Sequence, residues 1–279
     1  ALLGCDTRIN ARQFCDPMRG IFALPPTVLP APCTEPPPDL PDGLSDGGVI
    51  NPVYSEFQFG GAGMWWPERD ILTAPLHQNE LDTDHEITPD GIAVWGAIPG
   101  QRCDSTRAEI IAATAMLAAP IPCHVGIDNL NTVRFATCMI QNIDYLPRKP
   151  FGLIPNGDVL QVFQEHLRAK LTSSVLVSKV KGHATPEDVL EGRATARSKK
   201  GNDMSDRYAT KGIKVHSPEA IHYSKKCGVR EKLRICLQYD INLFMLDMLE
   251  ANRLTVAKDN RFSKSFGGTT IQVTSVGDG

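Results

Sequence analysis

The sequence predicts an α/β protein built on a mixed β-sheet. Three neighbouring segments, 44–54, 57–66 and 91–99, have the length and apolar content of strands. Beyond residue 105, helical and strand-like patterns alternate along the chain. The chain has 279 residues, and its 42% hydrophobic share is large enough to bury a substantial core. We therefore expect one mixed sheet of five strands with helices on both faces.

The elements after residue 105 are recognised by their periodicity and their stop signals. Segment 106–119 is rich in Ala, Ile, Leu and Met, and Pro120 ends it. Residues 123–128 form a short apolar strand that ends in Asp128. Five more elements are expected in chain order: a helix through about residue 140, an amphipathic helix at 158–170, a strand at 175–180, a polar loop at 184–201 and a helix at 202–211.

Two regions of the predicted domain have unusual composition. Gly60-Gly61-Ala62-Gly63 interrupts a strand, as expected where another part of the backbone approaches closely. Residues 67–90 form a polar, acidic insertion, and its carboxylates would repel phosphate groups. We expect no direct contact between this insertion and nucleic acid.

The folded domain is predicted to cover residues 44–212. Residues 1–43 are rich in proline, which suits an extended linker or a disordered segment. Residues 213–279 are expected to form a helical and irregular extension, mostly helix-forming from Pro218 to Glu250. The chain also lacks an initiator methionine, which suggests a piece of a longer product.

Composition excludes several classes of protein. The eight cysteines include no Cys-x-x-Cys pair, so we expect neither a zinc site nor a disulfide framework. The same pattern predicts an intracellular protein with reduced cysteines. There is no uninterrupted apolar run of 18 residues and no signal-peptide pattern at the start, so we expect no membrane span and no secretory signal. The net charge of −3 means that nucleic-acid binding would have to come from local basic patches.

Four acidic residues fall where this layout gathers ligands. They are Asp46 on the first strand, Glu109 in the first turn of a helix, Asp128 at the end of a strand, and Asp206 in a late helix. Ends of strands and starts of helices form the binding edge of an α/β sheet. Clustered carboxylates repel one another unless cations lie between them, and Mg²⁺ takes oxygen ligands. The sequence therefore predicts a magnesium site at this edge.

The motifs around these residues resemble those of the ribonuclease H family, type 1. They run in the family's order as Ser45-Asp46-Gly47-Gly48, Gly60-Gly61-Ala62-Gly63, Thr106-Arg107-Ala108-Glu109, Gly126-Ile127-Asp128-Asn129, Val180-Lys181-Gly182-His183-Ala184 and Gly201-Asn202-Asp203-Met204-Ser205-Asp206. The resemblance covers about residues 44–212 and is closest to ribonuclease H domains of retrotransposon polyproteins. Gly48 replaces the family's usual hydroxyl residue, and the segment after His183 is longer than in bacterial members.

The resemblance implies a ribonuclease H-like fold and hydrolysis of the RNA strand of RNA–DNA hybrids. Asp46, Glu109, Asp128 and Asp206 would hold two Mg²⁺ ions, with Mn²⁺ as a substitute, and His183 would assist turnover. Two such ions about 4 Å apart can activate a water and stabilise the leaving oxygen. Two other hypotheses stay open: a degenerate nucleic-acid-binding domain of a decayed retroelement, and a DNA-acting nuclease of the same fold. The chain could act alone or within a reverse-transcriptase polyprotein.

Each candidate residue also has a purely structural interpretation. Asp46 could be a turn residue before two glycines. Glu109 could complete a capping box with Thr106, and Asp128 could cap the following helix. His183 could be an ordinary exposed loop histidine. Asp206 competes with Asp203, which lies three residues earlier on the same helix.

Two basic stretches could contact the substrate. The first is in the polar loop, and the second is in the C-terminal extension. Phosphate contacts by these residues would make binding strongly salt-dependent. The alternative is a solvated surface, which we favour for the extension. The two sets are Arg193, Arg197, Lys199 and Lys200, and Lys225, Lys226, Arg230, Lys232 and Arg234.

Overall fold

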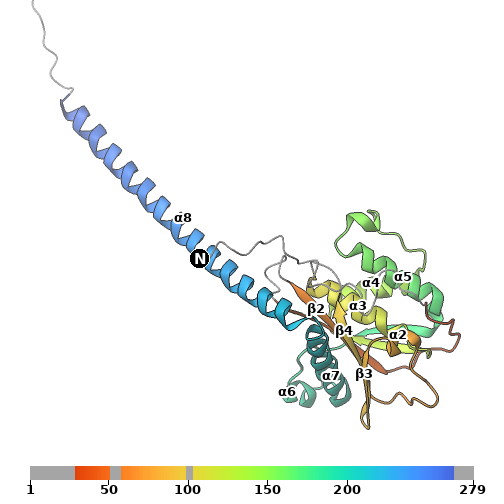
Figure 1. Ribbon diagram of the computed structural model, residues 1–279. Coiled ribbons are helices and arrows are strands. Elements are labelled where there is room, and N and C mark those ends of the chain that lie inside the picture. Colours follow the sequence, from red (N-terminus) through yellow and green to blue (C-terminus); the bar gives the residue numbers. More distant parts are fainter. Residues whose placement is uncertain (1–28, 51–57, 99–102, 267–279) are drawn as a thin grey trace, which may run out of the picture. The chain divides into compact units, whose positions relative to one another are not determined.

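A computed structural model describes residues 29–50, 58–98 and 103–266, with side chains to residue 258. The predicted strand ends at 51–54, 57 and 99, and most of the predicted linker, lie outside these residues. Figure 1 shows the arrangement of the elements. The strands are β1 (Gly43–Ile50), β2 (Phe59–Trp66), β3 (Asp84–Thr88), β4 (Gly91–Ile98), β5 (Cys123–Ile127) and β6 (Val175–Lys179). The α-helices are α2 (Gln78–Leu81), α3 (Ser105–Met116), α4 (Leu130–Gln141), α5 (Gly157–Lys170), α6 (Pro186–Leu190), α7 (Ala196–Ile213) and α8 (Pro218–Phe266), with 3₁₀ turns at Phe151–Leu153 and Thr172–Ser174.

The strands form one mixed sheet in the order β3-β4-β2-β1-β5-β6. The pairs β3–β4, β4–β2 and β2–β1 are antiparallel, whereas β1–β5 and β5–β6 are parallel. The described sheet therefore has six strands, and the predicted number of five was wrong. The additional edge strand β3 lies in the insertion, where its side chains are almost all exposed, so no alternation of apolar residues reveals it.

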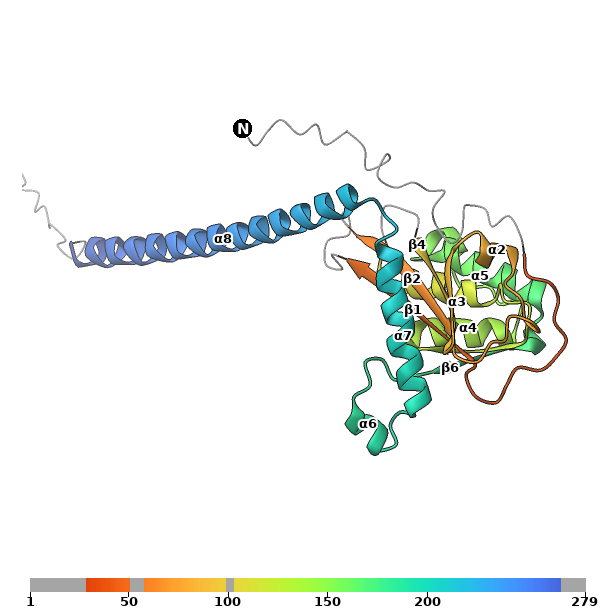
Figure 2. The same ribbon diagram turned by 60° about the horizontal axis from the view of Figure 1, so that its bottom comes forward.

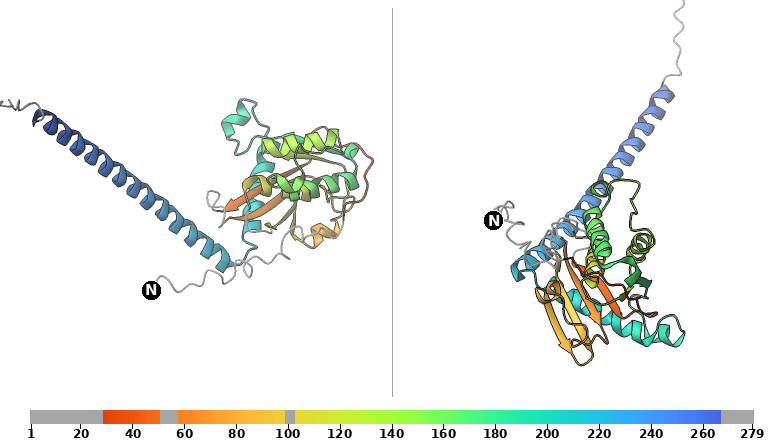
Figure 3. Two further views of the ribbon diagram at one scale, coloured as in Figure 1. Left: turned by 90° about the horizontal axis from the view of Figure 1, so that it is seen from above. Right: turned by 90° about the vertical axis from the view of Figure 1, so that its right-hand side faces the viewer.

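Helices cover both faces of the sheet, which confirms the predicted α/β class. Figure 2 shows α7 across one face and α3, α4 and α5 on the other, and Figure 3 shows the same layers from two more sides. Helix α7 packs on β1, β2 and β4, α3 packs on β1 and β2, and α4 packs on β6. The main core lies under α3 and α5 and includes Met64, Met116 and Phe163.

The glycines of β2 allow α7 to lie against the sheet at backbone distance. A Cβ atom on Gly61 would lie 2.2 Å from the Ile213 nitrogen, and one on Gly63 would lie 2.2 Å from the Ala209 nitrogen. Any side chain at either position would force the helix away from the strand. The predicted close approach at this glycine-rich segment is confirmed, and it fixes how far the residues of α7 stand from β1.

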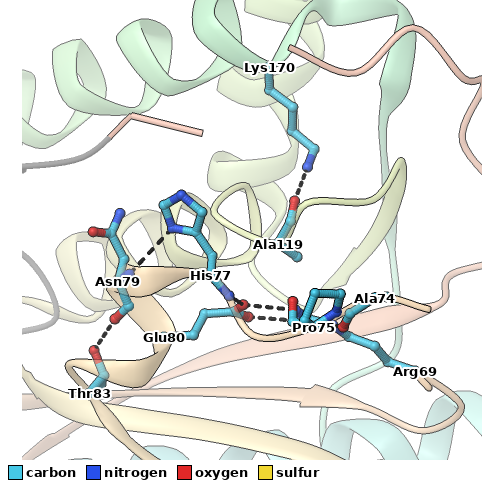
Figure 4. A network of polar contacts seen from close by, with 9 residues as sticks. All are labelled: Arg69, Ala74, Pro75, His77, Asn79, Glu80, Thr83, Ala119 and Lys170. Atoms are coloured by element: carbon cyan, nitrogen blue, oxygen red, sulfur yellow. Dashed lines mark hydrogen bonds and ion pairs between the residues drawn. The ribbon is translucent and has the colours of Figure 1, made fainter. Parts of the chain in front are cut away.

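The acidic insertion is folded and held by a buried ion pair. Arg69 forms a fork on Glu80 with nitrogen–oxygen distances of 2.6 and 2.8 Å, and these side chains are 1% and 3% exposed. Arg69 also donates to the carbonyl oxygens of Ala74 and Pro75, as Figure 4 shows. Such a pair is costly to break, because the remaining charge would be buried alone.

The segment predicted as a polar loop, 184–201, contains helix α6 and the first turns of α7. Thr185 caps α6 with Pro186 in its first turn, and Thr195 caps α7 together with Ser198. Helix α7 therefore begins at Ala196, six residues before the predicted start at 202. The prediction failed because the segment is so polar that its apolar periodicity is weak.

The chain divides into two compact units after Gly228, within α8. The second unit is the helical part from Val229 onward, and its described side chains are exposed except that of Glu231, which is partly buried. Helix α8 runs from Pro218 to Phe266, and the predicted division into a domain at 44–212 and an extension at 213–279 stays a prediction. Among the described residues, no helix is long and apolar enough to cross a membrane.

Candidate metal centre

Asp46 lies in the middle of β1 and not in a turn. It faces Gly63 of β2 in the antiparallel register, so the interpretation as a turn residue was wrong. Its side chain is buried, at 6% exposure. A Cβ on the next residue, Gly47, would lie 2.4 Å from the backbone nitrogen of Glu109. The absence of a side chain at Gly47 thus lets α3 bring Glu109 close to β1.

Glu109 lies in the second turn of α3 and has no capping role. The helix starts at Ser105, and Asp104 caps it by accepting a hydrogen bond of 2.7 Å from the Arg107 backbone. Thr106 is therefore inside the helix, and the capping-box interpretation was wrong. The Glu109 side chain is 5% exposed, and its Oε2 atom has no hydrogen-bond partner.

Asp128 follows the last residue of β5, at the edge where the parallel strands end. The cap of α4 is the next residue, Asn129, whose side chain accepts from the backbones of Asn131 and Thr132. The interpretation of Asp128 as the helix cap was therefore wrong. With its neighbour providing the cap, the partly exposed Asp128 carboxylate is left available for another partner.

The structure brings Asp46, Glu109 and Asp128 together. One carboxylate oxygen of each lies within 4.8 Å of the other two. Burial raises the pKa of Asp46 to about 7, and the charges of Asp128 and Asp206 add to this rise. Burial, followed by the charges of Asp46 and Asp128, also raises the pKa of Glu109 well above its usual value. Both shifts have the same two causes in the same order: burial, which disfavours the charged form, and then the neighbouring negative charges.

Asp206 lies on α7, outside the group of three, yet close enough for its charge to act on Asp46. Its competitor Asp203 is exposed and forms an ion pair of 2.6 Å with Lys199 one turn earlier on the helix. The Asp203 carboxylate thus has a surface partner, while Asp206 contributes to the field of the cluster. These observations favour Asp206 as the fourth carboxylate.

His183 lies on the turn after β6 and is exposed. Its backbone is in the left-handed region, with φ of 48°, which is uncommon for residues other than glycine. The preceding Gly182 contacts the cluster directly, since a Cβ there would lie 2.3 Å from Oδ2 of Asp128. The role of Gly182 was missed at the sequence level, where only its place beside His183 in a motif marked it.

The three carboxylates fit a divalent cation. All their ligand atoms are oxygens, which Mg²⁺ and Mn²⁺ accept, and a cation between them would offset their mutual repulsion. The Glu109 Oε2 atom is buried without a partner, an arrangement that is costly unless something binds it. The donor set therefore matches the predicted metal, although it does not distinguish magnesium from manganese.

Comparisons with known proteins found likenesses of structure. No protein-family model and no curated protein matches the chain. The solution structure of the PFV RNase H domain matches at 19% identity with a TM-score of 0.41, over 62% of this chain and 93% of that one. LC9-RNase H1, a type 1 RNase H with the type 2 active-site motif, matches at 14% identity with a TM-score of 0.39, over 64% of this chain and 76% of that one.

A longer protein also matches. The prototype foamy virus protease–reverse transcriptase is 18% identical with a TM-score of 0.42, and the match covers 67% of this chain but only 22% of that chain. This chain has a mixed sheet with helices on both faces. It also has an acidic cluster where β1, α3 and the end of β5 meet. On these features the chain has a ribonuclease H-like fold.

Proposed function

We propose that this protein is a metal-dependent nuclease that hydrolyses the RNA strand of RNA–DNA hybrids. The observation that carries the proposal is the convergence of Asp46, Glu109 and Asp128 from three separate elements, with one buried oxygen of Glu109 unpartnered. A protein that needed these residues only for its fold would bury fewer charges together, because each one costs stability.

The residues of the site would have separate roles in metal binding and proton transfer. Asp46, Glu109 and Asp128 would hold the divalent ions, and Asp206 would complete the set from α7. The bound ions would supply an activated water and charge stabilisation at the leaving oxygen. His183, exposed on its turn after β6, would carry a proton, since imidazole nitrogens can both accept and donate one.

The choice of RNA–DNA hybrid depends on the ordered motifs, including Lys181-Gly182-His183-Ala184 after β6. A DNA-acting nuclease of the same fold is the second candidate, because fold alone does not determine substrate. A degenerate binding domain is disfavoured physically. Without a bound cation, replacing buried Asp46 or Glu109 by a neutral residue would stabilise the fold, so the presence of acids at both positions favours a metal-binding role.

We propose that this activity belongs to an intracellular, reverse-transcribing polyprotein. The ordered motifs resemble those of ribonuclease H domains in retrotransposon polyproteins, which are parts of larger proteins. In that setting the polymerase part would deliver the hybrid to the cluster. The domain's own basic residues would then need to supply only part of the binding energy.

One gel tests the proposal. The full chain is incubated with a hybrid labelled on its RNA strand, with Mg²⁺, with Mn²⁺ or with EDTA, beside duplex DNA and duplex RNA. We expect internal cleavage of the hybrid RNA with either metal and none with EDTA. The variant Asp46→Asn should be inactive, whereas Asp203→Asn, the same change at an ion-paired surface residue, should keep activity. Cleavage of duplex DNA alone would favour the second candidate.

A further inference from the structure

The second compact unit has an apolar surface of an unusual kind. Its described helical residues carry large apolar side chains that are 43–63% exposed in the single chain. By the helical period of 3.6, seven of these residues and the exposed Cys236 form two stripes on nearly opposite sides of the helix. We name them the tyrosine stripe (Cys236, Tyr239, Leu243 and Leu246) and the phenylalanine stripe (Leu237, Ile241, Phe244 and Met248).

Both stripes have the spacing of a coiled-coil seam. The steps along the tyrosine stripe are three, four and three residues, and those along the phenylalanine stripe are four, three and four. Alternating steps of three and four keep one face of a helix against a partner helix. Other large apolar residues of this unit, among them Ile235, Met245 and Leu249, lie between the two stripes, so the helix is apolar around most of its circumference and is expected to be covered.

The charges at the ends of the tyrosine stripe specify the partner. Continuing the same spacing, Lys232 precedes Cys236 by four residues and Glu250 follows Leu246 by four residues. In a parallel pair of identical helices, Lys232 would face Lys232 and Glu250 would face Glu250. In an antiparallel pair, each Lys232 would face a Glu250, Cys236 would face Leu246, and Tyr239 would face Leu243.

The phenylalanine stripe disfavours the parallel pair as well. Its seam position before Leu237 is Arg234, which would face another Arg234 in a parallel pair and Ala251 in an antiparallel one. Like charges opposite one another at a seam are unfavourable, and opposite charges select orientation. Both stripes thus favour the same direction of the second helix.

We propose that the helix from Val229 to Lys258 is a self-association element, and that it pairs antiparallel with a second copy of this chain through the tyrosine stripe. Because Lys232 at one end of the stripe and Glu250 at the other have opposite charges, two identical helices complement each other when they run antiparallel. The phenylalanine stripe remains on the far side, where a second antiparallel contact can form, so assemblies of two or four chains both agree with this arrangement.

The mass of the full chain in solution tests the proposal first. We expect two or four chains by light scattering or sedimentation, and a monomer at all accessible concentrations would overturn the proposal. Lys232→Glu should weaken self-association about tenfold, because both symmetric contacts change from attraction to repulsion. The double variant Lys232→Glu/Glu250→Lys should restore it. Lys226→Glu, the same change outside the stripe, is the control and should have little effect.

A disulfide test separates the two orientations. In the antiparallel pair, Leu246→Cys would lie opposite the native Cys236 of the second copy, within bonding reach. Oxidation should then give a covalent dimer, and Leu246→Cys/Cys236→Ala should not, since the introduced thiols would be about 15 Å apart along the helix. Cross-linking of wild-type chains through Cys236 itself, or failure of the charge exchange to restore assembly, would contradict the antiparallel pair.

Discussion

Two acidic regions of the first unit differ in whether their carboxylates have basic partners. In the insertion, Glu68 pairs with Arg197 at 3.0 Å, Asp90 pairs with Lys200 at 3.2 Å, and Glu86 pairs with Lys211 at 2.7 Å. In the cluster, the carboxylates of Asp46 and Glu109 face each other and Asp128. Cations of α7 pair with these exposed acids, and Arg69 pairs with the buried Glu80 of the insertion, whereas no ion pair is formed by Asp46, Glu109 or Asp128 among the described residues.

The difference distinguishes a structural acid from a candidate ligand. The interaction with Lys211 lowers the pKa of Glu86, which is the expected effect of a neighbouring cation. The pKa of Asp46 moves in the other direction, mainly through burial. A group of acids, two of them buried and none with a counter-charge among the described residues, is therefore the feature that points to metal binding, and a count of acidic residues would not have found it.

The largest expected effect is loss of cleavage on changing one cluster residue. Asp128→Asn removes a ligand charge and should reduce cleavage at least about a thousandfold, the scale of losing a group that stabilises charge in the transition state. Hybrid binding should hold or tighten, because less negative charge faces the phosphates. Rates and affinities are measured separately at saturating Mg²⁺, with Asp203→Asn as the matched control. Near wild-type cleavage by Asp128→Asn would remove Asp128 from the metal site.

A smaller loss is expected for the residue outside the cluster. His183→Ala removes a proton carrier, and such groups typically contribute about 10²–10⁴-fold. Because His183 is exposed, water can replace part of its function, so we expect a loss at the lower end. The affinity for Mg²⁺, measured by calorimetry, should stay unchanged. A large drop in metal affinity would show that His183 belongs with the ligands instead.

The pH dependence of stability should distinguish the metal-free protein from the metal-bound one. The folded pKa of Asp46, about 7, lies above its ordinary value of 3.8, so the folded state holds a proton that the unfolded state releases. Without metal, the free energy of unfolding should therefore fall as pH rises from about 4 to 7. Thermal melts with EDTA should show this fall, and excess Mg²⁺ should oppose it at pH 8 more than at pH 5.

A neutral variant checks the cause of that fall. Asp46→Asn cannot ionise, so its metal-free melting temperature should vary less across the same pH range and lie above that of the wild type at pH 8. A shift of about 1 kcal/mol corresponds to roughly 2–4 °C in a domain of this size. An equally steep fall in Asp46→Asn would assign the pH dependence to other groups.

The smallest effect is expected in the insertion. Glu68→Gln or Glu86→Gln breaks an exposed ion pair, worth roughly 0–1 kcal/mol, so stability should change little. Cleavage should stay within about twofold of wild type, or rise slightly as Arg197 or Lys211 becomes free for phosphate. Comparing rates at low and high salt checks this, since any gain should vanish at high salt. A severe loss of cleavage would mean that the insertion is part of the active site.

Much of the fold could be predicted because the buried strands and helices carry clear apolar patterns. The glycine-rich β2 was predictable as a site of close packing, and Gly61 and Gly63 indeed lie against the backbone of α7. Strand β3 was not, because its side chains face solvent and carry no apolar alternation, although its pairing with β4 is a local hairpin that closes at Thr88 and Gly91. The early start of α7 had a local signal, Thr195 with Ser198, that weak apolar periodicity obscured.

The site was only partly predictable. The four acidic positions follow from the motifs and from their places at strand ends and in helices. The sequence could not show that Asp104 and Asn129 take the capping roles, which frees Glu109 and Asp128 for another function. Nor could it show that Gly182 contacts the Asp128 carboxylate, since that proximity depends on how the turn after β6 packs.

The most direct test of the central claim is to locate manganese in crystals of the full chain grown with Mn²⁺. The anomalous signal should show an ion between the carboxylates of Asp46, Glu109 and Asp128, and crystals of Asp128→Asn grown in the same way should show weaker occupancy or none. Ordered, empty carboxylates at millimolar Mn²⁺, with or without bound hybrid, would contradict the assignment of this cluster as a metal centre.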